Sequence, residues 1–378
     1  MAARLEHMLR QPIQKRDGRP AHVQVQERVI QVIEEGLLEP GSRLPSEPEL
    51  AEGLGVSRMT ANKALLALVD QGWIARQKGR GTYVLARPTA TTNFTLELIV
   101  GEDLATAIEN YYFGALYFGV QSAAAEQRVP VHCRSLRSLI ESQEELTSDG
   151  VIVINPPLSS LETLKRTLAK CKTKLILGAN WPGSQIPCID SDNILGAAQA
   201  VGHLADNGHR RILFVGACPE DSNTLDRVKG YDIACRLRSC QSVHPPLISP
   251  TALDLESEIE GRLTELLRSQ DRPTGIFVAG ATLALQVSRL VQQVGLSIPG
   301  DVSVVAYDDP AFLVTASPAL DTLRQPLGTM GRTAFNHLVA ALEGKSSPPL
   351  QTVLPPELIL RGSVGPARDR NLFSENLP

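Results

Sequence analysis

Short apolar segments alternate with stretches of helical pattern between residues 95 and 365, and this alternation most limits the possible folds. The segments are TLELIV (95–100), VPVHC (129–133), GVIVI (150–154), TKLILG (173–178), RRILFVG (210–216), GIFVAG (275–280) and VSVVAY (302–307). Apolar strands that alternate with helices form parallel sheets covered by helices on both faces. Two doubly wound lobes fit about 270 residues better than one. We therefore predict an α/β domain of two parallel-sheet lobes.

A different pattern, three short helices followed by a hairpin, occupies the start of the chain. Apolar spacing predicts one helix over 23–35 and a second that begins with Ser46 and Glu49 at capping-box spacing. A third helix begins at Ser57, directly after a glycine turn. The segment WIARQKGRGTYV (73–84) then alternates around a glycine-containing tip, which indicates a hairpin. The sequence thus predicts a small winged helix-turn-helix domain before the α/β domain.

One face of the third helix is suited to DNA. Its inward stripe is Ala61, Ala64, Leu65 and Leu68, at helical spacing. The outward side chains near its start, the start of the second helix and the wing tip can contact phosphates and base edges. These candidates are Ser46, Ser57, Arg58, Thr60, Asn62, Lys63, Lys78, Gly79 and Arg80. The alternative is a small helical oligomerisation domain with a solvated charged face.

Charge is unevenly distributed along the chain. Residues 1–87 hold 13 Lys and Arg against 10 Asp and Glu, whereas residues 88–378 hold 24 against 31. The basic part is the one suited to a polyanion. The six cysteines show no CxxC pair or zinc spacing, no run of 18 apolar residues exists, and no signal peptide is recognisable. We expect a cytoplasmic protein with no membrane span, metal or cofactor.

No catalytic constellation stands out. There is no GxGxxG, and the GKS at 344–346 lacks the earlier glycine of a P-loop. His203 and His209 have no third metal ligand near them in sequence. The segment DSDNILG (190–196) has Ile194 where a calcium loop needs an oxygen ligand, so it is more simply the capped start of a helix. We expect that the protein is not an enzyme.

RLPSEPELAEGLGVSRMTANKALLALVDQGWIARQKGRGTYV (43–84) is similar to the winged helix-turn-helix of GntR-type bacterial transcription regulators, over about residues 22–85. The resemblance implies DNA contacts at Ser57, Arg58, Thr60, Asn62, Lys78 and Gly79. Asn62 occupies a place often held by arginine, and Pro48 one that usually holds a basic, DNA-contacting residue.

Residues 95–365 resemble the ligand-binding domain of the LacI family, which has the type I fold of periplasmic sugar-binding proteins. The matching segments are ENYYFGALYFGVQSAA (109–124), DGVIVI (149–154), DSDNILGAAQAVGHLADNGHRRILFVG (190–216), DRVKGY (226–231), PTGIFVAGATLAL (273–285), IPGDVSVVAYDD (298–309) and PALDTLRQPLGTMGRTA (318–334). The resemblance implies a transcription regulator, a repressor rather than an activator. It would act as a homodimer on a double-stranded DNA operator and bind a small-molecule effector, a carbohydrate or a related compound, between its lobes.

Arg227 is the leading candidate for an effector contact, because its planar guanidinium suits hydroxyls or a carboxylate; a surface salt bridge is the alternative. The other candidates follow strands or occupy the same loop. They are Tyr112, Phe113, Asn180, Trp181, Asp221, Asn223 and Asp308. Tyr112 and Phe113 could equally be lobe core, and Asp308 a hinge residue.

Gly280-Ala281 stands where the LacI family typically has Asn-Asp, so a carboxylate that accepts hydrogen bonds from sugar hydroxyls is absent. Asn180 and Trp181 could compensate, or the ligand could be of another kind. Alternatively the sensor is degenerate and serves only for dimerisation.

We expect five regions: a mobile arm (1–21), the winged helix (22–85), a linker (86–94), the two-lobed domain (95–365) and a tail (366–378). Pro88 and the threonines of RPTATTNF favour extended chain. The linker is therefore not expected to form the minor-groove helix of the LacI family.

Overall fold

The structure is a computed structural model, in which the chain forms two compact units, Met1–Thr91 and Thr92–Pro378. It describes residues 8–9, 11–13, 20–70, 73–77, 81–85, 94–101, 110–142, 146–181, 183–242, 245–252 and 254–367. None of the helices in this part of the chain has the length and apolar character needed to cross a membrane.

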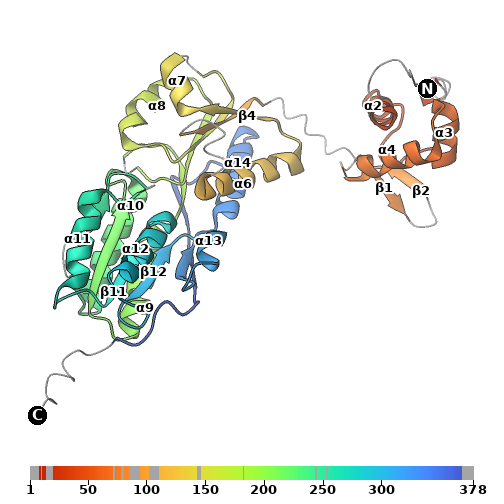
Figure 1. The fold of residues 1–378 in the computed structure, drawn as a ribbon. Helices are drawn as coiled ribbons and strands as arrows, with labels where there is room; N and C mark the ends of the chain where they lie inside the picture. Colours follow the sequence, from red (N-terminus) through yellow and green to blue (C-terminus); the bar gives the residue numbers. More distant parts are fainter. Residues whose placement is uncertain are drawn as a thin grey trace, which may run out of the picture. The chain divides into compact units, whose positions relative to one another are not determined.

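The N-terminal unit is the predicted winged helix-turn-helix (Figure 1). Its elements are α2 (Ala21–Glu34), α3 (Glu47–Leu54), α4 (Arg58–Asp70), β1 (Ile74–Gln77) and β2 (Gly81–Val84). The strands pair antiparallel with Gln77 opposite Gly81, and Arg43 forms a further bridge to Tyr83. The inward stripe predicted on α4 is fully buried in the core that α2 and α3 share.

Local hydrogen bonds set the helix starts in this unit. The backbone N–H and the hydroxyl of Ser46 both donate to the Glu49 carboxylate, at 2.7 Å each, and these bonds lower the pKa of Glu49. Gly55 has φ +67°, which lets the chain turn sharply between α3 and α4. Ser57 Oγ then accepts a hydrogen bond from the Thr60 backbone N–H at 3.1 Å.

Part of the N-terminal region that we expected to be a mobile arm packs against this unit. Leu9 is 6% exposed and lies in the same core. The Met8 carbonyl accepts a hydrogen bond from Arg28 Nη1 at 2.8 Å, and the Ile13 N–H donates to the Leu54 carbonyl at 3.1 Å. Residues 8–9 and 11–13 are therefore attached to the unit, while the remainder of 1–19 lies outside the described residues.

In the C-terminal unit, the first lobe is a six-stranded parallel sheet in the order β14-β7-β6-β5-β3-β4. The strands are β3 (Leu96–Val100), β4 (Val131–Ser135), β5 (Gly150–Ile154), β6 (Thr173–Leu177), β7 (Cys188–Ser191) and β14 (Gln351–Leu354). One face packs on α6 (Tyr111–Gln127) and α14 (Leu327–Leu342), the other on α7 (Leu136–Ser142) and α8 (Leu161–Thr167), which follows η1 (Leu158–Ser160).

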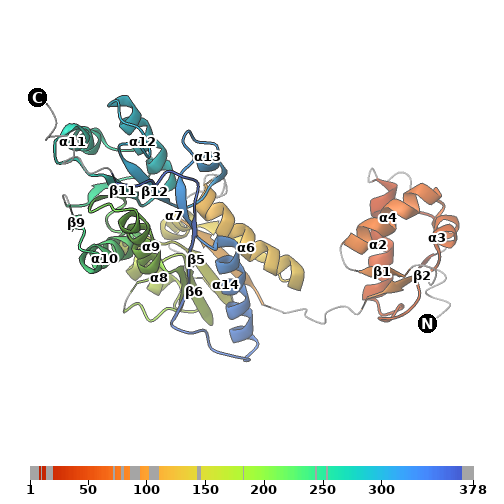
Figure 2. The same ribbon diagram turned by 90° about the horizontal axis from the view of Figure 1, so that it is seen from below.

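Two glycines allow α6 and α14 to pack at backbone distance, and Figure 2 shows these helices side by side. A Cβ on Gly119 would lie 2.4 Å from the Gly328 carbonyl oxygen, and one on Gly331 would lie 2.4 Å from the Leu116 carbonyl oxygen. No side chain fits at either position without separating the helices. This contact joins the start of the C-terminal unit to a helix near its end.

The second lobe is a seven-stranded sheet in the order β10-β8-β11-β12-β13-β15, with β9 also paired to β8. The strands are β8 (Arg211–Ala217), β9 (Gln241–Ser242), β10 (Leu247–Ser249), β11 (Gly275–Val278), β12 (Ser303–Tyr307), β13 (Asp321–Arg324) and β15 (Glu357–Ile359). One face packs on α9 (Asn193–Asp206) and α10 (Ser222–Leu237), the other on α11 (Ser257–Arg268) and α12 (Ala281–Gln293), and a short α13 (Ala311–Val314) follows β12.

Both lobes are thus doubly wound, as predicted, and each of the seven predicted segments overlaps a strand. Within the two lobes, all described strand pairs are parallel except β13 with β15, which is antiparallel. The prediction missed the short strands β7, β9, β10, β13, β14 and β15. The chain passes between the lobes three times, after β7, after β13 and after β14.

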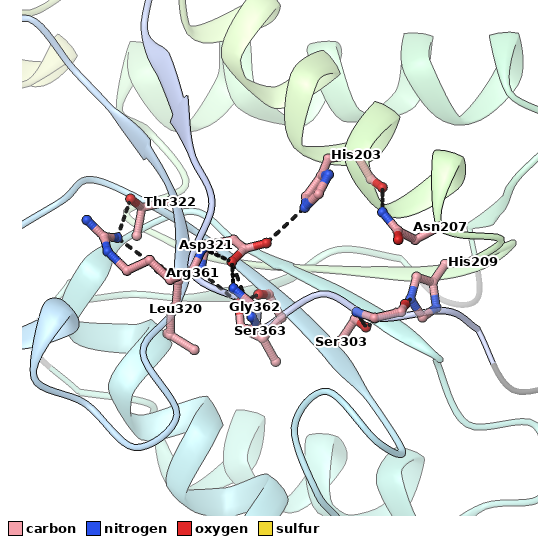
Figure 3. A network of polar contacts seen from close by, with 12 residues as sticks. His203, Asn207, His209, Ser303, Leu320, Asp321, Thr322, Arg361, Gly362 and Ser363 are labelled. Atoms are coloured by element: carbon pink, nitrogen blue, oxygen red, sulfur yellow. Dashed lines mark hydrogen bonds and ion pairs between the residues drawn. The ribbon is translucent and has the colours of Figure 1, made fainter.

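A buried polar network fixes the C-terminal segment to the second lobe (Figure 3). Asp321 Oδ2 lies 2.8 Å from His203 Nε2, and Asp321 Oδ1 accepts hydrogen bonds from the backbone N–H groups of Arg361, Gly362 and Ser363 at 2.6, 2.7 and 3.1 Å. Burial acts to raise the pKa of Asp321, but these partners outweigh it and lower the pKa. The presence of His203 is therefore explained by its contact with Asp321 rather than by metal binding.

Candidate functional site

The side chains predicted to contact DNA form an exposed group at the start of α3 and α4. Ser46, Ser57, Arg58 and Lys63 are exposed, and Thr60 and Asn62 are partly exposed. The predicted contacts Lys78, Gly79 and Arg80 lie outside the described residues. The described part of this surface presents hydroxyl, amide and basic groups from adjacent turns, which is the chemistry that phosphate and base contacts need.

Sequence reasoning missed Arg76, a basic residue of β1 beside this surface. Arg76 Nη2 donates a hydrogen bond to Asn62 Oδ1 at 2.8 Å and lies 3.8 Å from Glu47 Oε2. A hollow of about 210 Å³ next to this pair is also lined by Arg43 and Ser46. A guanidinium from the wing thus reaches Asn62, the helix position at which the resemblance to GntR-type regulators implies an arginine. The departure at Asn62 was the signal that could have directed attention to neighbouring basic residues.

Arg227 is the centre of the candidate effector site in the C-terminal unit. It lies on α10 and is 6% exposed. Its Nε donates to Asn193 Oδ1 at 2.9 Å, its Nη1 donates to the Ala279 carbonyl at 3.2 Å, and its Cζ lies 3.8 Å from the ring centroid of Tyr307. Cation–π contact and these bonds hold the guanidinium in a fixed plane. It is buried where the second lobe faces the first.

Polar contacts join the two lobes directly beside Arg227. Asn223 Nδ2, on the second lobe, donates to the Gly178 carbonyl of the first lobe at 3.0 Å and lies 3.4 Å from Tyr112 Oη. Tyr112 Oη itself donates to the Gly178 carbonyl at 2.9 Å. A few residues away, the Asn180 N–H donates to Ser222 Oγ at 3.0 Å. Four of the predicted effector residues, Tyr112, Asn180, Asn223 and Arg227, therefore lie in one connected region.

Gly178 is the residue that makes this contact possible. It has φ +79°, and a Cβ there would lie 2.3 Å from Tyr112 Oη. Any side chain would both strain the backbone and displace the tyrosine ring. The end of β6 is thus shaped so that its carbonyl faces Tyr112 and Asn223.

Three carboxyl groups lie near enough to Arg227 for its positive charge to affect their pKa values. Asp308 has φ +74° directly after β12, and Gln325 Nε2 donates to its Oδ1 at 2.6 Å. Asp221 precedes α10, and Asp190 is a β7 residue that is 2% exposed. Burial raises the pKa of all three carboxyls, to about 7 for Asp190, while the positive charge of Arg227 acts to lower each of them.

Asp190 was not among the predicted site residues. It falls in the segment DSDNILG (190–196), which we interpreted as the capped start of a helix, and Asp192 does cap α9 with a 2.9 Å hydrogen bond from the Leu195 N–H. Asp190, the other acidic residue of that segment, was the available signal, since burying a carboxylate is costly unless it has polar or charged partners.

Two predicted effector residues have their side chains in apolar surroundings. Trp181 is 6% exposed, packs with Ile176 and Ile186 in the first lobe, and donates from Nε1 to the Pro156 carbonyl at 3.0 Å. Phe113 packs edge to face on Tyr112, with ring centroids 5.5 Å apart, and against the core of the same lobe. Both therefore support the shape of the region rather than offering polar groups to a ligand.

Gly280-Ala281 begins α12 with no side-chain cap. A Cβ on Gly280 would meet no atom within 4 Å, so the position faces open space. A separate cavity of about 460 Å³ lies in the first lobe beside α7 and is lined by Leu136, Arg137 and Pro157 among others. None of the predicted effector residues lines that cavity.

Two family matches correspond to the two units. Residues 21–84 match the family described as "Bacterial regulatory proteins, gntR family", and residues 201–364 match the "Periplasmic binding protein-like domain". The "Arabinose metabolism transcriptional repressor" of Geobacillus stearothermophilus is 25% identical over 367 residues, which are 91% of this chain and 98% of the relative. The chain belongs to the GntR-type transcription regulators that carry a LacI-like domain.

Other relatives agree with this assignment. The "Probable opine utilization operon repressor" of Rhizobium rhizogenes is 33% identical to the regulator over 182 residues, 46% of this chain and 90% of the relative. The solved "transcriptional regulator CelR-cellobiose complex" has a TM-score of 0.62 at 23% identity and covers 82% of this chain and 91% of that structure. The regulator is thus a DNA-binding transcription factor and not an enzyme, with the fold of the LacI-type domain.

Proposed function

We propose that this regulator is a cytoplasmic repressor that binds a roughly palindromic operator as a homodimer. Its winged helix (22–85) reads DNA, its two-lobed domain (95–365) binds a small polar effector around Arg227, and a linker (86–94) couples them. Two α4 helices of the dimer would enter successive major grooves with half-site centres about 34 Å, or a multiple of it, apart. Effector binding lowers operator affinity.

The group of cross-lobe contacts around Arg227 carries the proposal. Asn223 and Tyr112 meet at the Gly178 carbonyl, so a ligand there touches both lobes at once. Relatives support the assignment, since their names describe repressors of arabinose metabolism and of opine utilisation, and one solved relative is a cellobiose complex. Sugars or related polar molecules are therefore the first effectors to test.

Coupling follows from differential binding to two arrangements of the lobes. A ligand that binds one arrangement better by about 1–3 kcal/mol shifts operator affinity by the matching factor. Arg227 orients the ligand through its fixed guanidinium. The contacts of Asn223 and Tyr112 depend on the separation of the lobes. A ligand that contacts only one lobe would bind both arrangements equally and release nothing.

The first experiment captures operators. Purified regulator retains fragments of the source organism's genomic DNA at near-physiological salt, and the retained DNA is sequenced. We expect a few palindromic sites near catabolic or transport genes. Weak, sequence-independent retention would contradict specific repression. Candidate effectors are then titrated against an operator found in this way, to test whether they release it. A ligand that binds but leaves operator affinity unchanged would exclude release by that ligand.

A second candidate function is a regulator whose lobes serve only for dimerisation. The lobes already contact each other through Asn180 and Ser222 as well as Asn223, and Gly280-Ala281 lacks the usual carboxylate. A thermal-shift screen with sugars, sugar acids and nucleobases separates the two functions. Stabilisation by a screened compound supports a sensor, and operator binding that no compound alters supports the dimerisation role.

A further inference from the structure

The hydrogen bond between Arg76 and Asn62 determines which half of the Asn62 amide is available to another molecule. Arg76 Nη2, on β1, donates to Asn62 Oδ1, on α4, at 2.8 Å. A guanidinium carries only donors, so the amide atom that it meets must be the oxygen. Asn62 Nδ2, which carries two N–H donors, has no acceptor among the described residues. The amide therefore offers donors, while its oxygen already has a partner.

Arg76 does not depend on Asn62 alone for its position. β1 lies beside α4 in the N-terminal unit (Figure 1). The same Nη2 that bonds Asn62 lies 3.8 Å from Glu47 Oε2, at the start of α3. A carboxylate on one helix and an amide oxygen on the next thus attract the same guanidinium, which keeps its positive charge next to Asn62.

Asn62 lies on the face of α4 that we propose enters the major groove. It is partly exposed and follows the exposed Arg58 by four residues, a spacing that places both side chains on one face of the helix. A free asparagine amide in the major groove reads adenine, because its oxygen accepts from N6 while its nitrogen donates to N7. That pairing needs the oxygen to which Arg76 already donates.

We propose that Arg76 is a specificity-determining residue that makes Asn62 select guanine instead of adenine. The inference rests on the proposed binding of α4 in the major groove. Guanine presents two acceptors there, O6 and N7, whereas adenine presents one acceptor beside an amino donor. The donors of Asn62 Nδ2 match the guanine edge. The adenine amino group would compete with Arg76 for Asn62 Oδ1 and would lie close to a positive charge.

Selection from random duplex DNA tests the base preference. The full-length regulator and Asn62→Ala, a change to a strong helix former, each select binding sites from a random-sequence library. We expect a position in each half-site at which the natural protein selects guanine and the variant selects no base. Fluorescence anisotropy should show that the natural protein binds the guanine operator about fivefold or more tightly than the adenine operator, and that Asn62→Ala binds both about equally. A preference of the natural protein for adenine at this position would overturn the inference.

Variants of Arg76 test the cause of the preference. Arg76→Met removes the donors, so the released amide of Asn62 should shift the ratio of the two affinities toward adenine by about fivefold or more. Arg76→Lys keeps a donor and a positive charge, and it should retain the preference for guanine. Arg43→Met removes another positive charge beside the same hollow. It should leave the ratio unchanged, because a general loss of attraction to phosphates affects both operators equally.

The outcomes separate this inference from the function on which it rests. A preference for guanine that persists in Arg76→Met would overturn the inference. A preference that Asn62→Ala retains and Arg76→Met loses would show that Arg76 contacts the base itself, and would also overturn it. Selected sites that do not depend on Asn62 would contradict the inference while supporting the operator function. Failure of the natural protein to select any sequence would contradict both.

Discussion

The candidate DNA contacts on α4 point to solvent from a single helix, whereas the groups around Arg227 come from α6, β7, α9, α10 and β12 and are buried against one another. On α4, one spacing rule decides both which residues are inside and which can touch DNA. Around Arg227, a side chain contributes to the site only if residues far apart in the chain contact it. A single substitution at the first site should therefore remove only that residue's own contact. At the second site, the residues form a coupled network, so one substitution affects several partners.

The largest effect should follow from Arg227→Ala, because Arg227 contacts Asn193, Ala279 and Tyr307 at once. The substitution leaves the buried carboxyls of Asp190 and Asp308 without a nearby positive charge. We expect the free energy of unfolding of the C-terminal unit to fall by about 3–5 kcal/mol, measured by urea denaturation. Arg238→Ala, which removes a surface ion pair with Asp206, should cost less than about 1 kcal/mol. Similar losses in both variants would show that the residues around Arg227 are no more coupled than those on the surface.

The pH dependence of stability tests the burial of Asp190. Burial raises the pKa of Asp190 from 3.8 to about 7, and the charge of Asp226 also raises it. The backbone N–H of Ser191, the charge of Arg227 and the side chain of Asn193 act to lower it. The folded state keeps this proton up to about pH 7 while the unfolded state releases it near pH 4. Stability should thus decrease as pH rises between these values, by up to about 4 kcal/mol.

The matched control is Asp190→Asn, which cannot titrate. The unfolding free energy of the natural protein minus that of the variant should fall with pH over this window, since other groups largely cancel. A difference that stays flat would mean that Asp190 is ionised and well solvated, and the contrast with the exposed DNA surface would be lost.

Arg58→Ala should lower operator affinity by about 1–3 kcal/mol if Arg58 contacts a guanine, because a bidentate contact to one base is worth that much. Filter binding or fluorescence anisotropy with the operator and with random DNA measures the loss. An equal loss on both DNAs would indicate a phosphate contact only. Gln31→Ala, an exposed change on α2, should alter neither affinity.

The smallest effect is expected for Arg76→Ala, at about 0.5–1.5 kcal/mol of operator affinity. Arg76 holds Asn62 by a 2.8 Å hydrogen bond, so the two residues should not behave independently. A double-mutant cycle with Asn62→Ala should give a coupling energy of at least about 0.5 kcal/mol. Additive losses would mean that Arg76 and Asn62 act independently, and the contrast with the residues around Arg227 would then be sharper.

Much of the fold was predictable because it follows from local pattern. The seven predicted strands and the α4 stripe come from apolar residues at regular spacing, and both lobes are confirmed. β7 was missed because CIDS (188–191) contains as many polar as apolar residues, and its burial depends on its two neighbouring strands. For the same reason Asp190 was not recognised. Arg76 was missed because the hydrogen bond to Asn62 spans fourteen residues of chain.

The three passages between the lobes also determine the order in which the protein can be completed during synthesis. The DNA-binding unit is finished once residue 85 has emerged, so it can fold while the rest is still being made. Each lobe, by contrast, receives its last strand from residues 351–359, β14 on the first sheet and β15 on the second. A ribosome that stops early would therefore release a chain with a complete winged helix but with neither lobe complete, and the two halves of the sensor are finished together or not at all.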